Sequence, residues 1–214
     1  NQGDGILELI NRSGGYESNA YPFGGILLNK GVEEISNLAR EKLYKEFLSA
    51  FVENASIVSS QDLSSSSLLL GELRETETVG RVSAIFEIDL LKKDKSLDTK
   101  LMDGDEIIIP EVINHLYVFG EISNEGTSKF YKGQDLKFYL DAQGGLTENA
   151  DTENIFVLHP NGKAERIKRK NIFRDGDKDL NLYPGSIIFI PRKSPTSLRA
   201  QSIQAYAAIL GNLG

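Results

Sequence analysis

The 214-residue chain lacks cysteine and tryptophan and contains one methionine and two histidines. Without cysteine it can form no disulfide, no thiolate-ligated metal centre and no thiol nucleophile. No segment approaches the roughly 20 consecutive apolar residues that a membrane-spanning helix needs, and the first residues do not read as a signal peptide. These absences exclude disulfide scaffolds, iron–sulfur proteins and thiol enzymes.

Positively charged residues are fewer than negatively charged ones. The chain has 24 Lys and Arg against 31 Asp and Glu, for a formal net charge of −7. A surface that binds nucleic acid needs a concentrated basic face. The one basic run, residues 166–170, has no aromatic residues between its charges and is interpreted as a solvated strand face. We therefore expect no nucleic acid as a partner.

Residues that could carry covalent chemistry are few and scattered. His115 and His159 have no partner at a metal-binding or catalytic spacing, so we predict that both are structural or surface residues. Two acidic clusters suggest calcium, but neither is closed by the glutamate that completes a calcium loop, and both are interpreted as polar turns. The clusters are Asp103, Asp105 and Glu106, and Asp175, Asp177 and Asp179. The sequence thus predicts a protein that is not an enzyme and that holds no metal and no cofactor; glycoside hydrolysis by an unidentified carboxylate pair is the least favoured alternative.

Two sequence landmarks occur twice in the same order. Residues 9–20 align without a gap with residues 139–150, and each copy reads as a short amphipathic helix ended by a glycine pair. Residues 101–110 align with 182–191, and each copy reads as a tight turn that leads into a buried strand closed by proline. The chain is therefore predicted to contain two copies of one module.

The second copy shows the complete pattern. Residues 116–122 and 128–131 read as two strands joined by a turn, and they precede the helix. After the helix, residues 155–159 and 164–167 form a predicted hairpin with Asn-Gly at its tip. Strands that clasp a single helix indicate an α+β, β-grasp-like architecture.

The first copy departs from this pattern in two ways. It has no counterpart of residues 116–131, so we expect either that the sequence begins inside the module or that a strand is supplied from elsewhere. It also carries an insertion at about residues 31–80, which is too long for an ordinary loop. The apolar spacing of residues 33–51 predicts a helix, Ser64–Ser67 reads as a turn or helix cap, and the alternation of residues 82–90 predicts a strand. The insertion is predicted to be a largely helical arm.

These features divide the chain into three predicted parts. Residues 1–112 form the first module, residues 113–193 the second, and residues 194–214 the start of an amphipathic C-terminal helix. Two interpretations of this helix are open. It packs on its own module, or it is the first part of a longer helix that associates with sister helices or with a membrane.

Val118-Phe119-Gly120-Glu121-Ile122, Gly126-Thr127, residues 144–147 and 150–151, and the two Ile-Pro strand endings resemble the soluble-ligand-binding β-grasp (SLBB) domain. Two such domains followed by a helix resemble Wza-type outer-membrane polysaccharide export proteins. The landmark residues that this resemblance marks as ligand-binding or turn-shaping are Gly120, Glu121, Gly126, Gly144, Gly145, Gly14, Gly15, Asp103, Gly104 and Asp105.

The resemblance implies a homo-oligomeric ring in the periplasm of a Gram-negative bacterium. A capsular polysaccharide or exopolysaccharide would pass through the ring, and the C-terminal helices would lead through the outer membrane. We expect the insertion to reach a neighbouring subunit or an inner-membrane polysaccharide co-polymerase. The alternative is a monomeric periplasmic carbohydrate-binding or scaffold module of the same fold, since a fold alone does not fix a function.

Overall fold

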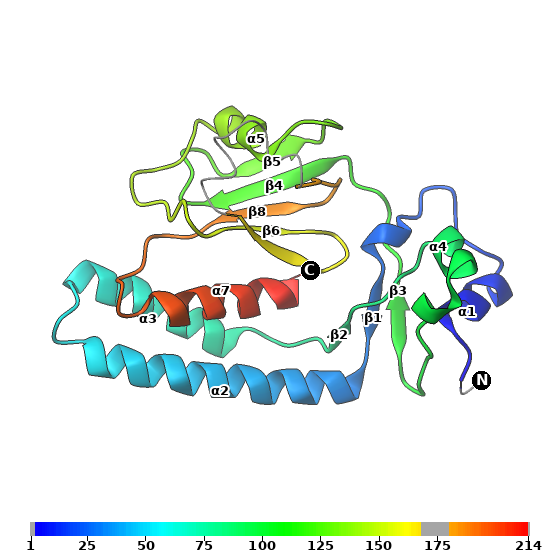
Figure 1. Ribbon diagram of the computed structural model, residues 1–214, viewed down its shortest axis with the longest axis horizontal. Coiled ribbons are helices and arrows are strands. Elements are labelled where there is room, and N and C mark those ends of the chain that lie inside the picture. The colour runs from blue at the N-terminus through cyan, green and yellow to red at the C-terminus, as the bar shows by residue number, and fades with distance from the viewer. Residues whose placement is uncertain (1–2, 168–179, 214) are drawn as a thin grey trace.

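The computed structural model describes residues 3–167 and 180–213. A three-stranded sheet lies at one end of the molecule and a five-stranded sheet at the other, and a layer of helices runs beneath the larger sheet (Figure 1). The expectation of an α+β fold is confirmed at this level.

The smaller sheet has the order β2–β1–β3, and both of its strand pairs are antiparallel. Its strands are β1 (Ile26–Leu28), β2 (Arg81–Val82) and β3 (Glu106–Ile108). Beside it lie α1 (Ile6–Arg12), α4 (Ile88–Lys93) and the 3-10 turns η1 (Pro22–Gly24) and η2 (Lys95–Leu97). Its buried core consists of Ile6, Ile10, Leu27, Phe86 and Leu91.

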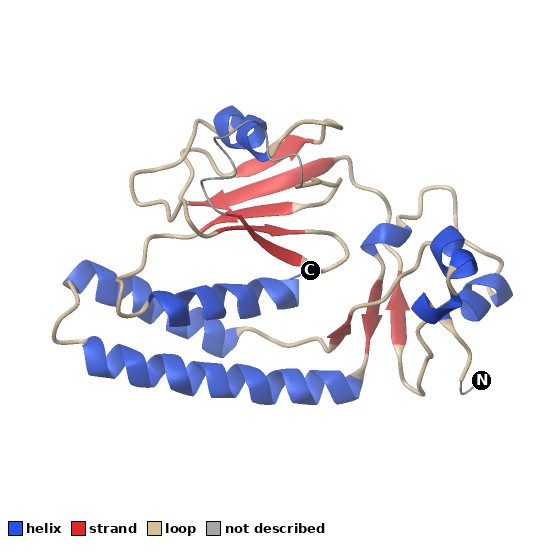
Figure 2. Cartoon of the chain, in the orientation of Figure 1, coloured by secondary structure: helices blue, strands red, loops and turns tan. Residues whose placement is uncertain are grey.

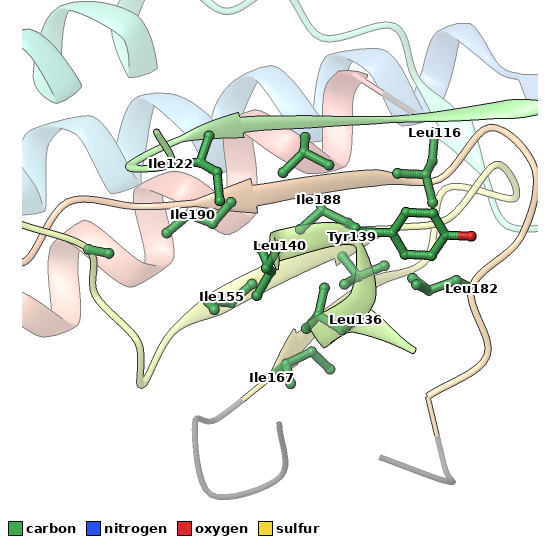
Figure 3. Packing of buried hydrophobic residues seen from close by; sticks show 13 residues of the cluster. Leu116, Ile122, Leu136, Tyr139, Leu140, Ile155, Ile167, Leu182, Ile188 and Ile190 are labelled. Carbon is green, nitrogen blue, oxygen red and sulfur yellow. The ribbon is translucent and has the colours of Figure 1, made fainter. Parts of the chain in front are cut away.

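The larger sheet has the order β5–β4–β8–β6–β7, in which β4 and β8 are parallel. Its strands are β4 (His115–Gly120), β5 (Gly126–Lys129), β6 (Ile155–Leu158), β7 (Ala164–Ile167) and β8 (Ile187–Ile190). Helix α5 (Leu136–Ala142), capped by the Asp135 side chain, packs its apolar face across this sheet, with Tyr139 fully buried at the centre (Figure 3). Isoleucine, leucine and valine side chains of the strands complete this core.

The two sheets repeat one pattern of backbone pairing. Ile26 pairs with Ile108 in the smaller sheet, as Phe156 pairs with Phe189 in the larger. Hydrogen bonds outside the strands repeat as well: the amide of Tyr21 donates to the Pro110 carbonyl at 2.7 Å, and its counterpart at Asp151 donates to Pro191 at 2.8 Å. The sequence repeat is therefore a repeat of structure.

Three helices form the layer beneath the larger sheet (Figure 2). They are α2 (Lys30–Asn54), α3 (Ser60–Glu75) and α7 (Arg199–Leu213). Helix α7 lies between the sheet and the α2–α3 pair: Tyr206 contacts the rings of Phe156 and Phe189, and Ala205 packs with Phe47 and other apolar residues of α2 and α3. The insertion helix predicted at residues 33–51 is confirmed, and the C-terminal helix packs on its own chain.

Three predictions for the first copy are wrong in detail. Ser64–Ser67 lies inside α3, because Ser59 caps that helix and the hydroxyls of Ser64 and Ser65 donate to carbonyls four residues earlier. The strand predicted at residues 82–90 ends at Val82, since β1 offers a partner only to Arg81 and Val82, and Ile88 begins α4.

The strand that contains Ile108 was predicted to be buried, but the Ile108 side chain is 41% exposed. Within the described residues β3 has a partner strand on one side alone, whereas its counterpart β8 is flanked by β4 and β6. Most of the basic run 166–170, and all of Asp175, Asp177 and Asp179, lie outside the described residues.

Candidate functional site

The second-copy landmarks meet where β4 ends. Gly120 has φ +99°, and a Cβ at this position would lie 2.1 Å from the carbonyl oxygen of Ile190 on β8. The Gly120 amide donates to the Glu125 carboxylate at 2.7 Å, which closes the turn before Gly126 and β5. Glycine at position 120 thus allows the β4 and β8 backbones to approach each other.

The turn between β4 and β5 rests on the glycine pair that ends α5. The Ser123 amide donates to the Gly145 carbonyl at 3.0 Å, and the Asn124 amide donates to Gln143 at 3.0 Å. The Ser123 hydroxyl also lies 3.0 Å from each of the Gly144 and Gly145 carbonyl oxygens. These bonds satisfy carbonyls that the end of a helix leaves without partners, so this part of the landmark is a rigid, internally bonded structure.

Glu121 is the charged member of the cluster. It accepts a hydrogen bond of 2.5 Å from the Thr147 hydroxyl, and Arg192 lies 3.5 Å from its other carboxylate oxygen. Tyr206 of α7 lies close enough for its titration to respond to these charges: burial, together with the smaller effects of the Asp151 and Glu121 carboxylates, raises the pKa of Tyr206 to about 12. The cluster therefore extends from the turn landmarks to the C-terminal helix.

A hollow of about 310 Å³, lined by polar and apolar residues alike, lies beside this cluster. Its polar lining is Lys137, Asp141, Thr147, Thr152 and Lys193. Lys137 is paired with Asp141, and Lys193 donates to the Glu148 carbonyl at 2.9 Å. Ammonium and hydroxyl groups of this kind can hydrogen-bond a hydroxylated or anionic ligand. The described residues contain no group of His, Cys, Asp or Glu that could hold a metal ion.

The first-copy landmarks lie on the smaller sheet, apart from this cluster (Figure 1). Gly14 and Gly15 end α1 with φ of +95° and +89°, and Gly104, with φ +85°, forms the turn before β3. Asp105 accepts hydrogen bonds from the Met102 amide at 2.8 Å and from the Asn29 side chain at 2.6 Å, while Asp103 is exposed. Since Asn29 caps α2, Asp105 anchors the insertion to its module.

Sequence reasoning missed the side chains that connect distant segments. Arg192, Thr147 and Tyr206 complete the Glu121 cluster, yet only Thr147 belongs to one of the quoted motifs, and no role was predicted for its side chain. Arg81 was also missed: its guanidinium donates at 2.8 Å to the Pro160 carbonyl in the other copy. A positively charged residue directly after the repeated Ile-Pro strand ending is the one signal that could have drawn attention to Arg192.

Comparisons with known proteins agree with one another. Residues 124–212, from the β4–β5 turn through α7, match the family model described as capsule biosynthesis GfcC C-terminal. Two proteins of Escherichia coli named polysialic acid transport protein KpsD are 26% and 25% identical over 208 residues, which cover 94% of this chain. The chain spans 35% of the length of these relatives. Both comparisons point to proteins of capsule biosynthesis and polysaccharide export.

Among the described residues, no helix combines the length and the apolar character needed to cross a bilayer.

Proposed function

We propose that this chain is the periplasmic part of an oligomeric outer-membrane channel subunit that exports capsular polysaccharide or exopolysaccharide. The observation that carries the proposal is the similarity to a polysialic acid transport protein over 94% of the chain. The work of such a subunit is structural and involves no covalent chemistry. Its place is the periplasm and outer membrane of a Gram-negative bacterium.

The bonding of the landmark residues supports a structural role. Glu121, Ser123 and Asp105 each direct their polar atoms to groups of the same chain, at distances of 2.5 to 3.0 Å. Side chains bonded in this way hold turns and helix ends in place. A module built like this suits a ring whose subunits must keep their shape while a polymer passes.

The outer surface of the α2–α3 arm supports assembly. Its helices carry large apolar side chains that are mostly exposed, with Ile35 67%, Val52 65% and Leu68 77% exposed. Apolar side chains that are exposed in one chain are often covered in protein–protein contacts. In the proposed ring this surface contacts a neighbouring subunit, and an inner-membrane polysaccharide co-polymerase is the second partner to consider.

The decisive measurement is the native mass of the full-length protein extracted from its membrane. We expect a discrete ring-sized oligomer that dissociates when Ile35, Val52 and Leu68 are replaced by glutamate. The matched control replaces the exposed polar residues Ser49, Ser64 and Ser67 of the same helices by glutamate and should leave the mass unchanged. Deleting the arm is a poorer test, since the arm also supplies Phe47 and Leu73 to the core around α7.

A monomeric native mass would contradict the ring. The hollow beside Thr147 would then favour the alternative function, a periplasmic carbohydrate-binding or scaffold module. Titration of the monomer with an acidic capsular oligosaccharide, with and without alanine at Lys137 and Lys193, would test that function directly.

A further inference from the structure

The smaller sheet presents an open strand edge. Strand β3 pairs with β1, and within the described residues no strand lies on its other side. Its counterpart β8 carries β4 on that side, parallel, with Tyr117 opposite Ile187 and Phe119 opposite Phe189. An unpaired edge offers backbone donors and acceptors to an incoming strand. The repeat thus shows which kind of strand fits this edge.

A hollow of about 250 Å³ adjoins the open edge. Its apolar lining includes Leu9, Leu101 and Ile107, all partly exposed. Their counterparts in the second copy, Tyr139, Leu182 and Ile188, are buried in one core cluster together with Leu116 and Val118 of β4 (Figure 3). The hollow therefore corresponds to the volume that β4 side chains fill in the larger sheet.

The path of the chain into α1 matches the path by which the second copy leaves β5. Gly3 has φ +93° and Gly133 has φ +86°, and the two are related by the same spacing as Gly14 and Gly144. In the second copy, three residues separate the end of β5 from Gly133. A hairpin placed directly before Gly3 would reach the open edge of β3 without a long connection.

We propose that a β-hairpin in the segment of the full-length protein that precedes residue 1 docks on β3. Its second strand leads into α1, and its first strand pairs in parallel with β3 in the register that β4 adopts on β8. Alternate apolar side chains of that first strand fill the hollow beside Leu9 and Ile107. This assignment is independent of the proposed transport role. The match covers 35% of the relatives' length, so these proteins have further chain outside it.

The register makes a prediction for individual amides. In the second copy, the Tyr117 amide donates to Ser186 at 3.1 Å and the Glu121 amide donates to Ile190 at 2.8 Å. The backbone hydrogen-bonding groups of Ser186, Ile188 and Ile190 thus point toward β4. Because these groups alternate along a strand, those of Phe189 point toward β6. By the repeat, the amides of Ile107 and Ile109 face the docked strand, and that of Ile108 faces β1.

The test is amide hydrogen exchange in the full-length protein, followed residue by residue by NMR. We expect the Ile107 and Ile109 amides to exchange at least about 100-fold more slowly than in an unfolded peptide, at every protein concentration. The Ile108 amide reports whether the sheet itself is folded. Free exchange at Ile107 and Ile109 beside a protected Ile108 would overturn the proposal. Protection that grows with concentration would also overturn it, since a second copy would then occupy the edge.

Variants on α1 test the hollow separately. Leu9→Asp places a charge in the hollow and should accelerate exchange at Ile107 and Ile109 about tenfold or more, whereas Asn11→Asp adds the same charge at an exposed position of α1 and should not. If Leu9→Asp also exposes Ile108, Leu9→Ala serves as the milder variant. Unchanged exchange at Ile107 in a folded Leu9 variant would count against the hairpin. The native mass of the oligomer is recorded in parallel, so a failure of the ring proposal remains distinguishable.

Discussion

Gly120 shows how one residue fixes the junction of two strands. Its backbone lies so close to β8 that a Cβ would stand 2.1 Å from the Ile190 carbonyl oxygen. Gly14 has a similar φ, +95° against +99°, yet nothing lies within 4 Å of its Cβ position. Substitutions at these two positions therefore separate two free-energy costs of adding a Cβ: that of a left-handed backbone, at both positions, and that of steric crowding, at Gly120 alone.

We expect Gly14→Ala to reduce the free energy of unfolding by about 1 kcal/mol, the ordinary cost of a left-handed L-residue. Gly120→Ala should cost about 3 kcal/mol or more, because the backbone of β4 or β8 must also move. Denaturant unfolding of the two variants measures both values. Equal losses would show that the close approach at Gly120 contributes nothing.

Helix α7 connects elements that are far apart in the sequence. One face meets the aromatic rings of β6 and β8, and another meets the arm through Leu198, Ala205 and Ile209. The arm contributes Phe47, which is fully buried, while Ile35 on the same helix is 67% exposed. The insertion is therefore part of the core that holds the C-terminal helix.

Phe47→Ala should lower the free energy of unfolding by about 3–5 kcal/mol, through lost burial and the cavity left behind. It should also accelerate amide exchange in α7, although the two segments are distant in sequence. Ile35→Ala, the control on the same helix, should change stability by no more than about 0.5 kcal/mol. Undisturbed exchange in α7 after Phe47→Ala would mean that the arm and α7 are energetically independent.

On the scale of the whole molecule, the two copies meet at the β6–β7 turn. The ring centroid of Phe23 in the first copy lies 4.3 Å from that of Tyr183, and the ring centroid of Tyr183 lies 5.5 Å from that of His159. Arg81 reaches across to the carbonyl of Pro160, the residue that follows His159. Burial lowers the pKa of His159, outweighing the opposing effect of the Glu165 carboxylate 3.8 Å away.

This burial predicts a pH dependence of stability. The folded state disfavours the charged imidazole of His159. The contribution of this residue to the free energy of unfolding is therefore present in full above its unfolded pKa of about 6.5 and is lost as the pH falls toward its folded pKa. The slope of this loss is at most about 1.4 kcal/mol per pH unit. Glu165, whose pKa is lowered by its hydrogen bond to Lys163, acts in the same direction, but only near pH 4 and below.

His159→Gln should flatten the dependence just below pH 6.5, as measured by denaturant midpoints across pH 5–8. His115→Gln, at an exposed strand end, is the control and should leave the slope unchanged. An unaltered slope in His159→Gln would show that another group controls this range.

The parts that could be predicted from the sequence are those that local rules determine. The glycine pairs at Gly14 and Gly144 ended their helices as predicted, since a left-handed residue ends a helix wherever it lies in the fold. The apolar face of α2 and the Asn161-Gly162 hairpin were likewise local patterns. The alternation at residues 82–90 was a misleading signal because alternation indicates partial burial and not strand pairing: Phe86 is buried within residues 83–87, which pair with no strand.

The sequence by itself determined the repeat, the α+β composition and the helical character of the arm, because periodicity and turn chemistry act over a few residues. Only the tertiary structure decided that the arm packs against α7 and that Arg192 and Tyr206 join Glu121. These features depend on contacts between segments more than 50 residues apart. No local pattern encodes such contacts, because they form only when segments that are distant in the sequence pack against one another.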